Sequence, residues 1–267
     1  MSAEKPILFS TEMVRAILDG RKTQTRRVVK IKNCRPMHKN HAGDLVVCND
    51  SKPLGEQIYP VKPPLHTGDI LWVRETWRLC DKHVEMGACH TDDNCREDNC
   101  ESPYMRKTDL HYDDERNKAI AKILGESLLS WKPSIHMPRA AARIFLQVTG
   151  VRAERLQDIS EWDAFHEGCD GESDCIGISV CGTPRDACSE CRKGCVDEYA
   201  VLWNKLNGKP KPIYATVGGK KTVTHYESYP WENIQETREY RGKPWIVCGN
   251  PWVWVYEFKQ VSSSNHK

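Results

Sequence analysis

Two cysteine-dense, polar segments interrupt this chain and constrain its fold more than any other feature. The chain has 267 residues and 13 cysteines, and ten of those cysteines fall in two clusters. The first segment is rich in Asp, Glu and Asn, and the second is rich in Gly, Cys and charged residues. We therefore expect residues 78–130 and 169–243 to be insertions with little apolar content of their own. They interrupt a single domain over residues 6–260, which is followed by a disordered tail, 261–267.

Apolar periodicity outside these segments predicts several strands and two helices. Ser10 caps one helix, which ends at Gly20. Ser160 caps the other, which turns Trp162 and Phe165 inward and ends at Gly168. Strands are predicted at residues 7–9, 21–31, 67–77, 142–156 (as a pair) and 251–259. Mostly antiparallel strands with two helices favour an α+β arrangement, a small β-barrel with flanking helices, over an alternating βαβ sheet.

Composition excludes several classes of protein. A formal net charge of +2 is too small for a protein held to nucleic acid by bulk charge, although local basic patches remain open. No apolar run approaches the roughly 18 residues of a membrane-spanning helix. The polar start has no apolar signal core, so we expect a cytoplasmic protein, in which cysteines point to metal ligation or incidental thiols.

Four motifs in order, "ILDGRKTQTRR", "GDILWVRETW", "ISEWDAFHEG" and "NPWVWVYEFK", resemble the ASCH superfamily, whose fold is a PUA-like β-barrel. The start of the chain, together with "SIHMPRAAARIFLQVTGVRAERLQDIS", resembles the larger members found in phages and prophages. The resemblance covers residues 6–77, 131–168 and 244–259, about half of the chain. It does not account for the two cysteine-rich segments.

The resemblance implies two kinds of activity. Many members bind RNA or nucleotides in a cleft of the barrel, and some small members are amidohydrolases that remove the acyl group from N4-acetylcytidine. The working Lys, Thr and Glu of those hydrolases fall on Lys22, Thr25 and Glu167 of this chain. We therefore expect Thr25 as nucleophile, Lys22 as its base and Glu167 as acid or base, with no catalytic cofactor.

This chemistry places demands on the segment "GRKTQTRR". A lysine acts as a base only when burial or nearby cations lower its pKa, and the flanking arginines supply that charge. Arg27 or a backbone amide near Thr25 could bind the oxyanion. Residues three apart on a regular strand face opposite ways, so Lys22 and Thr25 converge only if the chain curls after Gly20. The alternative interpretation of this segment is a solvent-exposed basic strand at the edge of a sheet, without a catalytic role.

Five residues are predicted to bind substrate. Glu75 lies between apolar neighbours and needs a partner, for which Arg27, Arg74 or a cytosine amino group would serve. Trp77 or Trp72 could stack on a base, but for either one alone a position in the core or at its rim is the favoured interpretation. Arg139 could reach a phosphate or base edge, or form a surface salt bridge. The full set is Arg27, Arg74, Glu75, Trp77 and Arg139.

The motif "CSECRKGC" spaces three cysteines to wrap around one tetrahedral ion. These are Cys188, Cys191 and Cys195, and the fourth ligand is Cys169, Cys175 or Cys181, of which we choose Cys181. Zinc in a structural role is favoured over an iron-sulfur cluster. A second, weaker set is Cys89, His90, Cys95 and Cys100, and unligated thiols are the alternative for both.

The sequence therefore predicts an amidohydrolase acting on N4-acylated cytosine nucleosides or related bases, with a modified cytosine nucleoside or RNA as its partner. A non-enzymatic RNA- or nucleotide-binding module is the alternative, and an RNA-cleaving or base-modifying enzyme is the third possibility. Glu167 favours the hydrolase, because a pure binder has no need of a carboxylate facing phosphates.

Overall fold

A computed structural model describes residues 3–31, 37–48, 58–79, 104–106, 132–170 and 194–262. The chain divides into two compact units, each assembled from segments far apart in the sequence. The first unit comprises Met1–Gly20, Gly68–Val148 and Phe258–Lys267, and the second comprises Arg21–Thr67 and Thr149–Glu257. No helix within the described ranges is long and apolar enough to cross a membrane.

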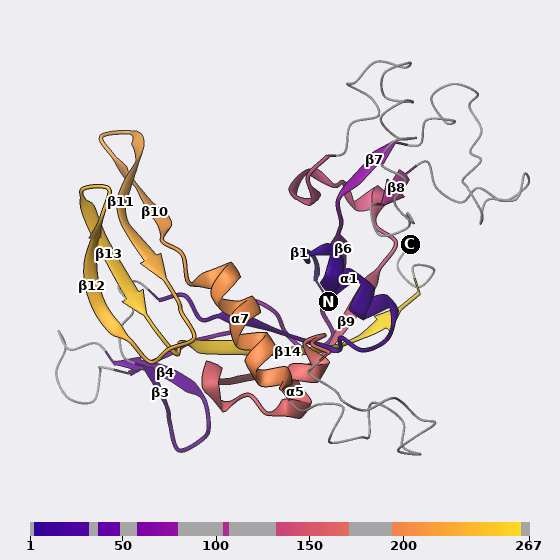
Figure 1. The fold of residues 1–267 in the computed structure, drawn as a ribbon, viewed down its shortest axis with the longest axis horizontal. Helices are drawn as coiled ribbons and strands as arrows, with labels where there is room; N and C mark the ends of the chain where they lie inside the picture. Colours follow the sequence, from indigo (N-terminus) through magenta and orange to yellow (C-terminus); the bar gives the residue numbers. More distant parts are fainter. Residues whose placement is uncertain are drawn as a thin grey trace, which may run out of the picture. The chain divides into compact units, whose positions relative to one another are not determined.

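The first unit combines one helix with short strands (Figure 1). Its elements are β1 (Glu4–Leu8), α1 (Thr11–Leu18), β6 (Ile70–Arg74), β7 (Trp77–Leu79), β8 (Tyr104–Arg106), η2 (Ser134–His136) and η3 (Arg139–Ala141), with the first residues of β9 (Phe145–Arg155) and the last of β14 (Trp252–Val261). Strand β1 runs parallel to β6, which is antiparallel to β9.

Helix α1 begins and ends where the sequence predicts. The Ser10 side chain accepts a hydrogen bond from the backbone amide of Met13, as expected of a helix N-cap. Gly20 follows the helix with a φ of +74°, a left-handed conformation that glycine adopts without strain. Both predicted boundaries of this helix are confirmed.

The second unit contains the remaining sheets and two helices that pack together, α5 (Glu161–His166) and α7 (Cys195–Asn207) (Figure 1). The 3-10 helix η4 (Leu156–Asp158) precedes α5. Its strands are β2 (Gln24–Val28), β3 (Met37–Lys39), β4 (Leu45–Cys48), β5 (Ile58–Pro60), β10 (Lys211–Val217), β11 (Lys220–Ser228), β12 (Gln235–Tyr240) and β13 (Lys243–Cys248), with most of β9 and β14. Strands β3-β4-β5 and β10-β11-β13-β12 form separate sheets, and β2 pairs antiparallel with β14.

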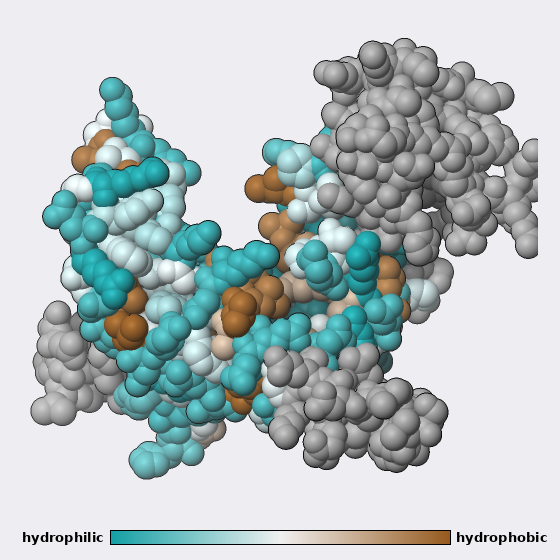
Figure 2. Space-filling view, viewed as in Figure 1, coloured by the Kyte–Doolittle hydropathy of each residue, from teal (hydrophilic) through white to brown (hydrophobic). Residues whose placement is uncertain are grey.

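The core of the second unit lies between its two helices and β14. Phe165 of α5, Tyr199 and Trp203 of α7, and Val253 and Val255 of β14 are all buried in one cluster. On the face seen in Figure 2, the described surface is mainly hydrophilic, with scattered brown, hydrophobic side chains. Both helices also expose apolar side chains, namely Trp162 of α5 and Val201 and Leu206 of α7.

Several sequence predictions need correction. The α+β class is confirmed, with mostly strands and few helices, but the described strands form open sheets rather than a closed barrel. In the five-stranded order β1-β6-β9-β14-β2, β1 and β2 are the two edges. Residues 142–156 give the single long strand β9 rather than a strand pair. Trp162 is 45% exposed, because a six-residue helix buries only its Ala164 and Phe165 side.

The segment predicted as a second insertion contains regular structure. Helix α7 and strands β10, β11 and β12 lie within residues 169–243. Tyr199 and Trp203 of α7 belong to the core cluster, and the indole nitrogen of Trp203 donates to the carbonyl oxygen of Tyr229 at 2.7 Å. The expectation of little apolar content there is wrong for the part that the structure describes.

Candidate functional site

The basic segment before β2 lies against the C-terminal end of α5. The backbone amide of Thr23 donates to the carbonyl of His166 at 2.9 Å, and Nζ of Lys22 donates to the carbonyl of Glu167 at 2.7 Å. Nη1 of Arg21 donates to the carbonyl of Gly168 at 3.2 Å. Three successive carbonyls at the helix end thus gain donors, two of them cationic, which suits the negative end of the helix dipole.

Lys22 and Glu167 form a buried ion pair. Nζ of Lys22 lies 2.7 Å from Oε2 of Glu167, and their side chains are 0% and 2% exposed. The other carboxylate oxygen, Oε1, accepts from Nη1 of Arg26 at 3.1 Å. Burial lowers the pKa of Lys22, and Arg27 lowers it further, while the charge of Glu167 opposes both effects.

A wider network of ion pairs surrounds this pair. Arg26 donates to Glu154 from Nε at 2.9 Å and from Nη2 at 2.6 Å, and Gln24 donates to Asp163 at 2.8 Å. Arg152 bridges Glu154 and Asp163 at 3.1 and 3.2 Å. Burial alone would raise the pKa of Asp163, but the hydrogen bond from Gln24 and the charges of the two arginines lower it.

Sequence analysis missed most of this network. Its signal is present as spacing, since polar residues two apart share one face of a strand and residues four apart share one face of a helix. The relevant pairs are Gln24 and Arg26 in β2, Arg152 and Glu154 in β9, and Asp163 and Glu167 in and after α5. Which strand would lie against which helix could not be known from those spacings.

Thr25 lies in the middle of β2 and pairs with Tyr256 of β14. The side chains of its neighbours, Gln24 and Arg26, reach Asp163 and Glu167 respectively. Because side chains alternate along a strand, Thr25 is directed to the opposite face of β2. The structure therefore brings Lys22 and Glu167 together and turns the buried Thr25 hydroxyl the other way.

Arg27 also lies in β2, where its side chain is exposed. The other four predicted substrate-binding residues belong to the first unit. Glu75 there is 2% exposed and accepts two hydrogen bonds from Arg143, at 3.1 and 3.2 Å. The buried carboxylate has thus found a partner that the sequence analysis did not name.

Glu75 also lines a cavity of about 280 Å³ in the first unit. Hydroxyl side chains line it as well, among them those of Ser10, Thr11 and Ser134. Trp77 packs in the core with Met137 and Ala141, which agrees with its interpretation as a core residue.

The two remaining arginines make local contacts in the first unit. Arg74 lies 4.7 Å from the ring centroid of Trp72 and donates to the carbonyl of Ile135 at 3.1 Å. Arg139 forms a two-pronged ion pair with Glu4, at 2.5 and 2.9 Å, with its side chain 44% exposed. Arg139 is thus engaged in the surface salt bridge that the sequence left open.

Among the predicted zinc ligands, only Cys195 lies in the described part of the chain, whereas Cys181, Cys188 and Cys191 lie outside it, as does the second cysteine set. Cys195 is buried, and its Sγ lies 3.9 Å from the carbonyl oxygen of Cys169. Neither Cys169 nor Cys195 forms a disulfide, whereas Cys248 does. The described residues contain no group of three or more potential metal ligands.

Comparison with known proteins yields no match to a protein family, to a curated protein or to a solved structure. The arguments about function therefore rest on the residues and geometry described above.

Proposed function

We propose that the protein is an amidohydrolase that removes the acyl group from N4-acylated cytosine nucleosides or related bases. The observation that carries the proposal is the buried contact of 2.7 Å between Lys22 and Glu167. A lysine that binds nucleic acid presents its ammonium group to phosphates in solvent. An ammonium group desolvated against a carboxylate is instead suited to proton transfer, because small changes around it move its proton.

In this proposal the proton of the ion pair first passes from Lys22 to Glu167, which leaves a neutral amine beside a protonated carboxyl group. Lys22 then accepts the proton of the attacking group, and Glu167 donates its proton to the departing exocyclic nitrogen, which restores the ion pair. The lowered pKa of Lys22 brings its neutral form closer to the working pH. Thr25 is the nucleophile that the resemblance implies, although its direction in β2 favours a water molecule activated by the pair. The resemblance to the PUA-like fold belongs to the same proposal. A structural zinc ion bound by Cys181, Cys188, Cys191 and Cys195 also belongs to it.

The test is the ultraviolet spectrum of N4-acetylcytidine incubated with the full-length protein. Conversion to cytidine is expected, and Lys22→Met and Glu167→Gln should each slow it by about a hundredfold or more. Lys5→Met is the matched control, because it removes a lysine that pairs with Asp69 at 3.3 Å in the first unit. Its rate should equal that of the unmodified protein.

Thr25→Ala separates the two possible nucleophiles. Loss of conversion with Thr25→Ala, together with activity in Thr25→Ser, assigns the attack to the hydroxyl, whereas retained activity in both assigns it to water. In either case the rate should follow a bell-shaped pH profile, because the pair is active only while Lys22 is neutral and Glu167 still holds a proton. No conversion over hours by folded protein contradicts the hydrolase and leaves the binding module.

One observation favours the alternative, a non-enzymatic RNA- or nucleotide-binding module. Glu167, Glu154 and Asp163 each already accept from a cation of the same network. A network so fully paired can serve stability alone, and the exposed Arg27 then supplies the contact to phosphate.

A further inference from the structure

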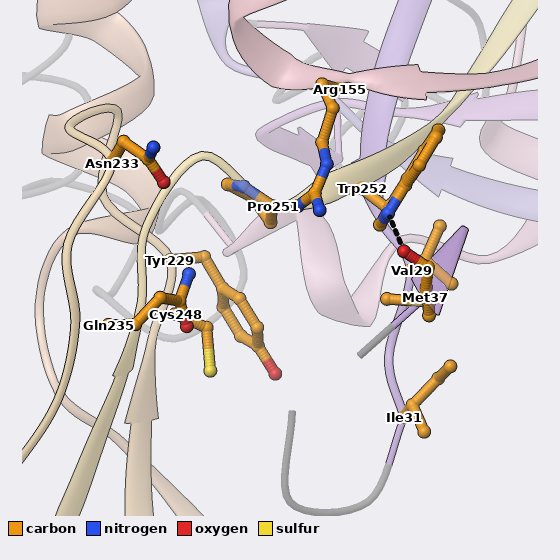
Figure 3. Close-up of a pocket in the computed structure, with 10 residues that line it drawn as sticks. All are labelled: Val29, Ile31, Met37, Arg155, Tyr229, Asn233, Gln235, Cys248, Pro251 and Trp252. Atoms are coloured by element: carbon orange, nitrogen blue, oxygen red, sulfur yellow. Dashed lines mark hydrogen bonds between the residues drawn. The ribbon is translucent and has the colours of Figure 1, made fainter. Parts of the chain in front are cut away.

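The second unit contains a cavity of about 400 Å³ that none of the residues of the ion-pair network line. Figure 3 shows its walls: Val29 and Met37 lie on one side, Tyr229 and Gln235 on the other, and Arg155 points down between them. The volume falls in the lower part of the range of small-molecule sites, which is about 300–1,000 Å³. The cavity is thus large enough for one small ligand.

Arg155 is the charged residue of this cavity. In the described part of the chain, its guanidinium lies 4.8 Å from the ring centroid of Trp252 and donates from Nη1 to the carbonyl of Asn250 at 3.1 Å. Neither partner carries a full negative charge. The carboxylate of Asp158 accepts from the backbone amide of Arg155 at 3.3 Å, and its negative charge also acts on the guanidinium, although no ion pair joins the two side chains in the described part of the chain. Arginine remains charged even where burial lowers its pKa, so this cation favours an anion beside it.

The remaining walls combine apolar surface with a few polar atoms. The indole nitrogen of Trp252 is already used, because it donates to the carbonyl of Met37 at 2.9 Å. The side-chain amide nitrogen of Gln235 donates to the carbonyl of Gly249 at 2.8 Å, which leaves its carbonyl oxygen as an acceptor. The phenol of Tyr229 donates to Glu227 at 2.5 Å, so its ring is held in place. Such walls suit a flat ring with one hydrogen-bonding edge.

We propose that this cavity binds a small aromatic or heteroaromatic carboxylate, with its carboxylate on Arg155 and its ring beside Tyr229. One guanidinium matches one negative charge, and its planar fork matches the two carboxylate oxygens. A phosphate carries more charge and usually needs further donors than a single arginine provides. The carboxylate is therefore the better fit in charge.

The test is isothermal titration calorimetry of the full-length protein with nicotinate and nicotinamide, which share a ring and differ in the negative charge. Nicotinate should bind about tenfold or more tightly than nicotinamide, as expected for a hydrogen-bonded charge pair. Arg155→Gln should remove this preference. Arg238→Gln is the matched control, since Arg238 also stacks on a tryptophan, 5.2 Å from the ring of Trp245, and should leave it unchanged.

A second variant keeps the test valid if Arg155→Gln does not fold. Asn233 lines the cavity with an exposed side chain, so Asn233→Asp adds a negative charge without disturbing the core. It should weaken nicotinate and leave nicotinamide unaffected. Equal affinity for the two ligands, no binding of nicotinate at millimolar concentration, or binding of 5′-CMP without nicotinate would each overturn the proposal.

Discussion

Replacing Glu167 by glutamine tests the energetics of the buried ion pair. The variant keeps one acceptor oxygen, for either Lys22 or Arg26, while its amide nitrogen is a donor that faces the other cation, and the negative charge is lost. Removing one partner of a buried pair costs about 3–5 kcal/mol, because the other charge stays buried without compensation. Since one hydrogen bond is lost together with the charge, we expect a loss of about 4 kcal/mol in the free energy of unfolding, a large part of the roughly 5–15 kcal/mol that is typical of a domain.

The loss should depend on pH in a defined direction. Burial lowers the pKa of Lys22 below its usual 10.5, so the folded state releases this proton at a lower pH than the unfolded state does. Stability therefore rises with pH between the folded pKa and 10.5. Without Glu167 the pKa of Lys22 falls further, so the deficit of the variant should be largest near pH 6 and smaller near pH 9.5.

Urea unfolding followed by tryptophan fluorescence at these two pH values measures the effect. The control is Lys5→Met, which breaks a pair whose lysine side chain is 38% exposed and should cost less than about 1 kcal/mol. The double variant Lys22→Met/Glu167→Leu removes both charges and should recover much of the stability. A deficit below about 1 kcal/mol for Glu167→Gln, or one that grows with pH, would refute the reasoning.

Two further predictions concern the backbone. Ser160→Ala removes the hydroxyl that accepts from the amide of Asp163 at 3.1 Å and should cost about 1 kcal/mol of unfolding free energy in urea titration. Ser160→Thr should cost almost nothing, because it keeps a hydroxyl that accepts from this amide and donates to the Asp163 carboxylate. Gly249→Ala would place a Cβ 1.9 Å from the carbonyl oxygen of Glu232, so the backbone must move. We expect thermal unfolding of this variant to show a loss of about 3 kcal/mol or more in stability. Gly219→Ala is the control: its Cβ meets no atom within 4 Å, so it should lose only about 1–2 kcal/mol, through the positive φ of Gly219. A loss at Gly249 that is smaller than the loss at Gly219 would contradict this account.

The parts of the fold that sequence predicts well are those with local signals. The caps at Ser10 and Ser160 and the strand β14 depend on residues within a few positions of each other, and all three are confirmed. The alternation along β14 is not, because its four successive residues 253–256 are all buried. Barrel closure depends on which edges pair, and no local pattern in β1 or β2 specifies that. Similarly, Trp162 looked inward because its spacing to Phe165 fits a helix face, but α5 is too short to bury both.

The candidate site shows the same division. Lys22 and Glu167 were singled out through the resemblance, and the structure brings them together across 145 positions of chain. The supporting groups Glu154 and Asp163 were missed, because their contacts with Arg26 join β2, β9 and α5. Contacts over such separations are set by packing, which spacing within one element does not encode.

Stability alone gives a poor reason for Lys22 and Glu167 to occupy this position. A buried ion pair is on average no more stabilising than apolar side chains of the same volume, because both charges lose their hydration. A carboxylate just after the C-terminal end of α5 is also unfavourable against the helix dipole, until Lys22 and Arg26 neutralise it. Glu167 is therefore tolerated at this position because two cations, Lys22 and Arg26, neutralise it. Proton transfer is a role that a desolvated lysine and carboxylate can perform and that apolar residues cannot.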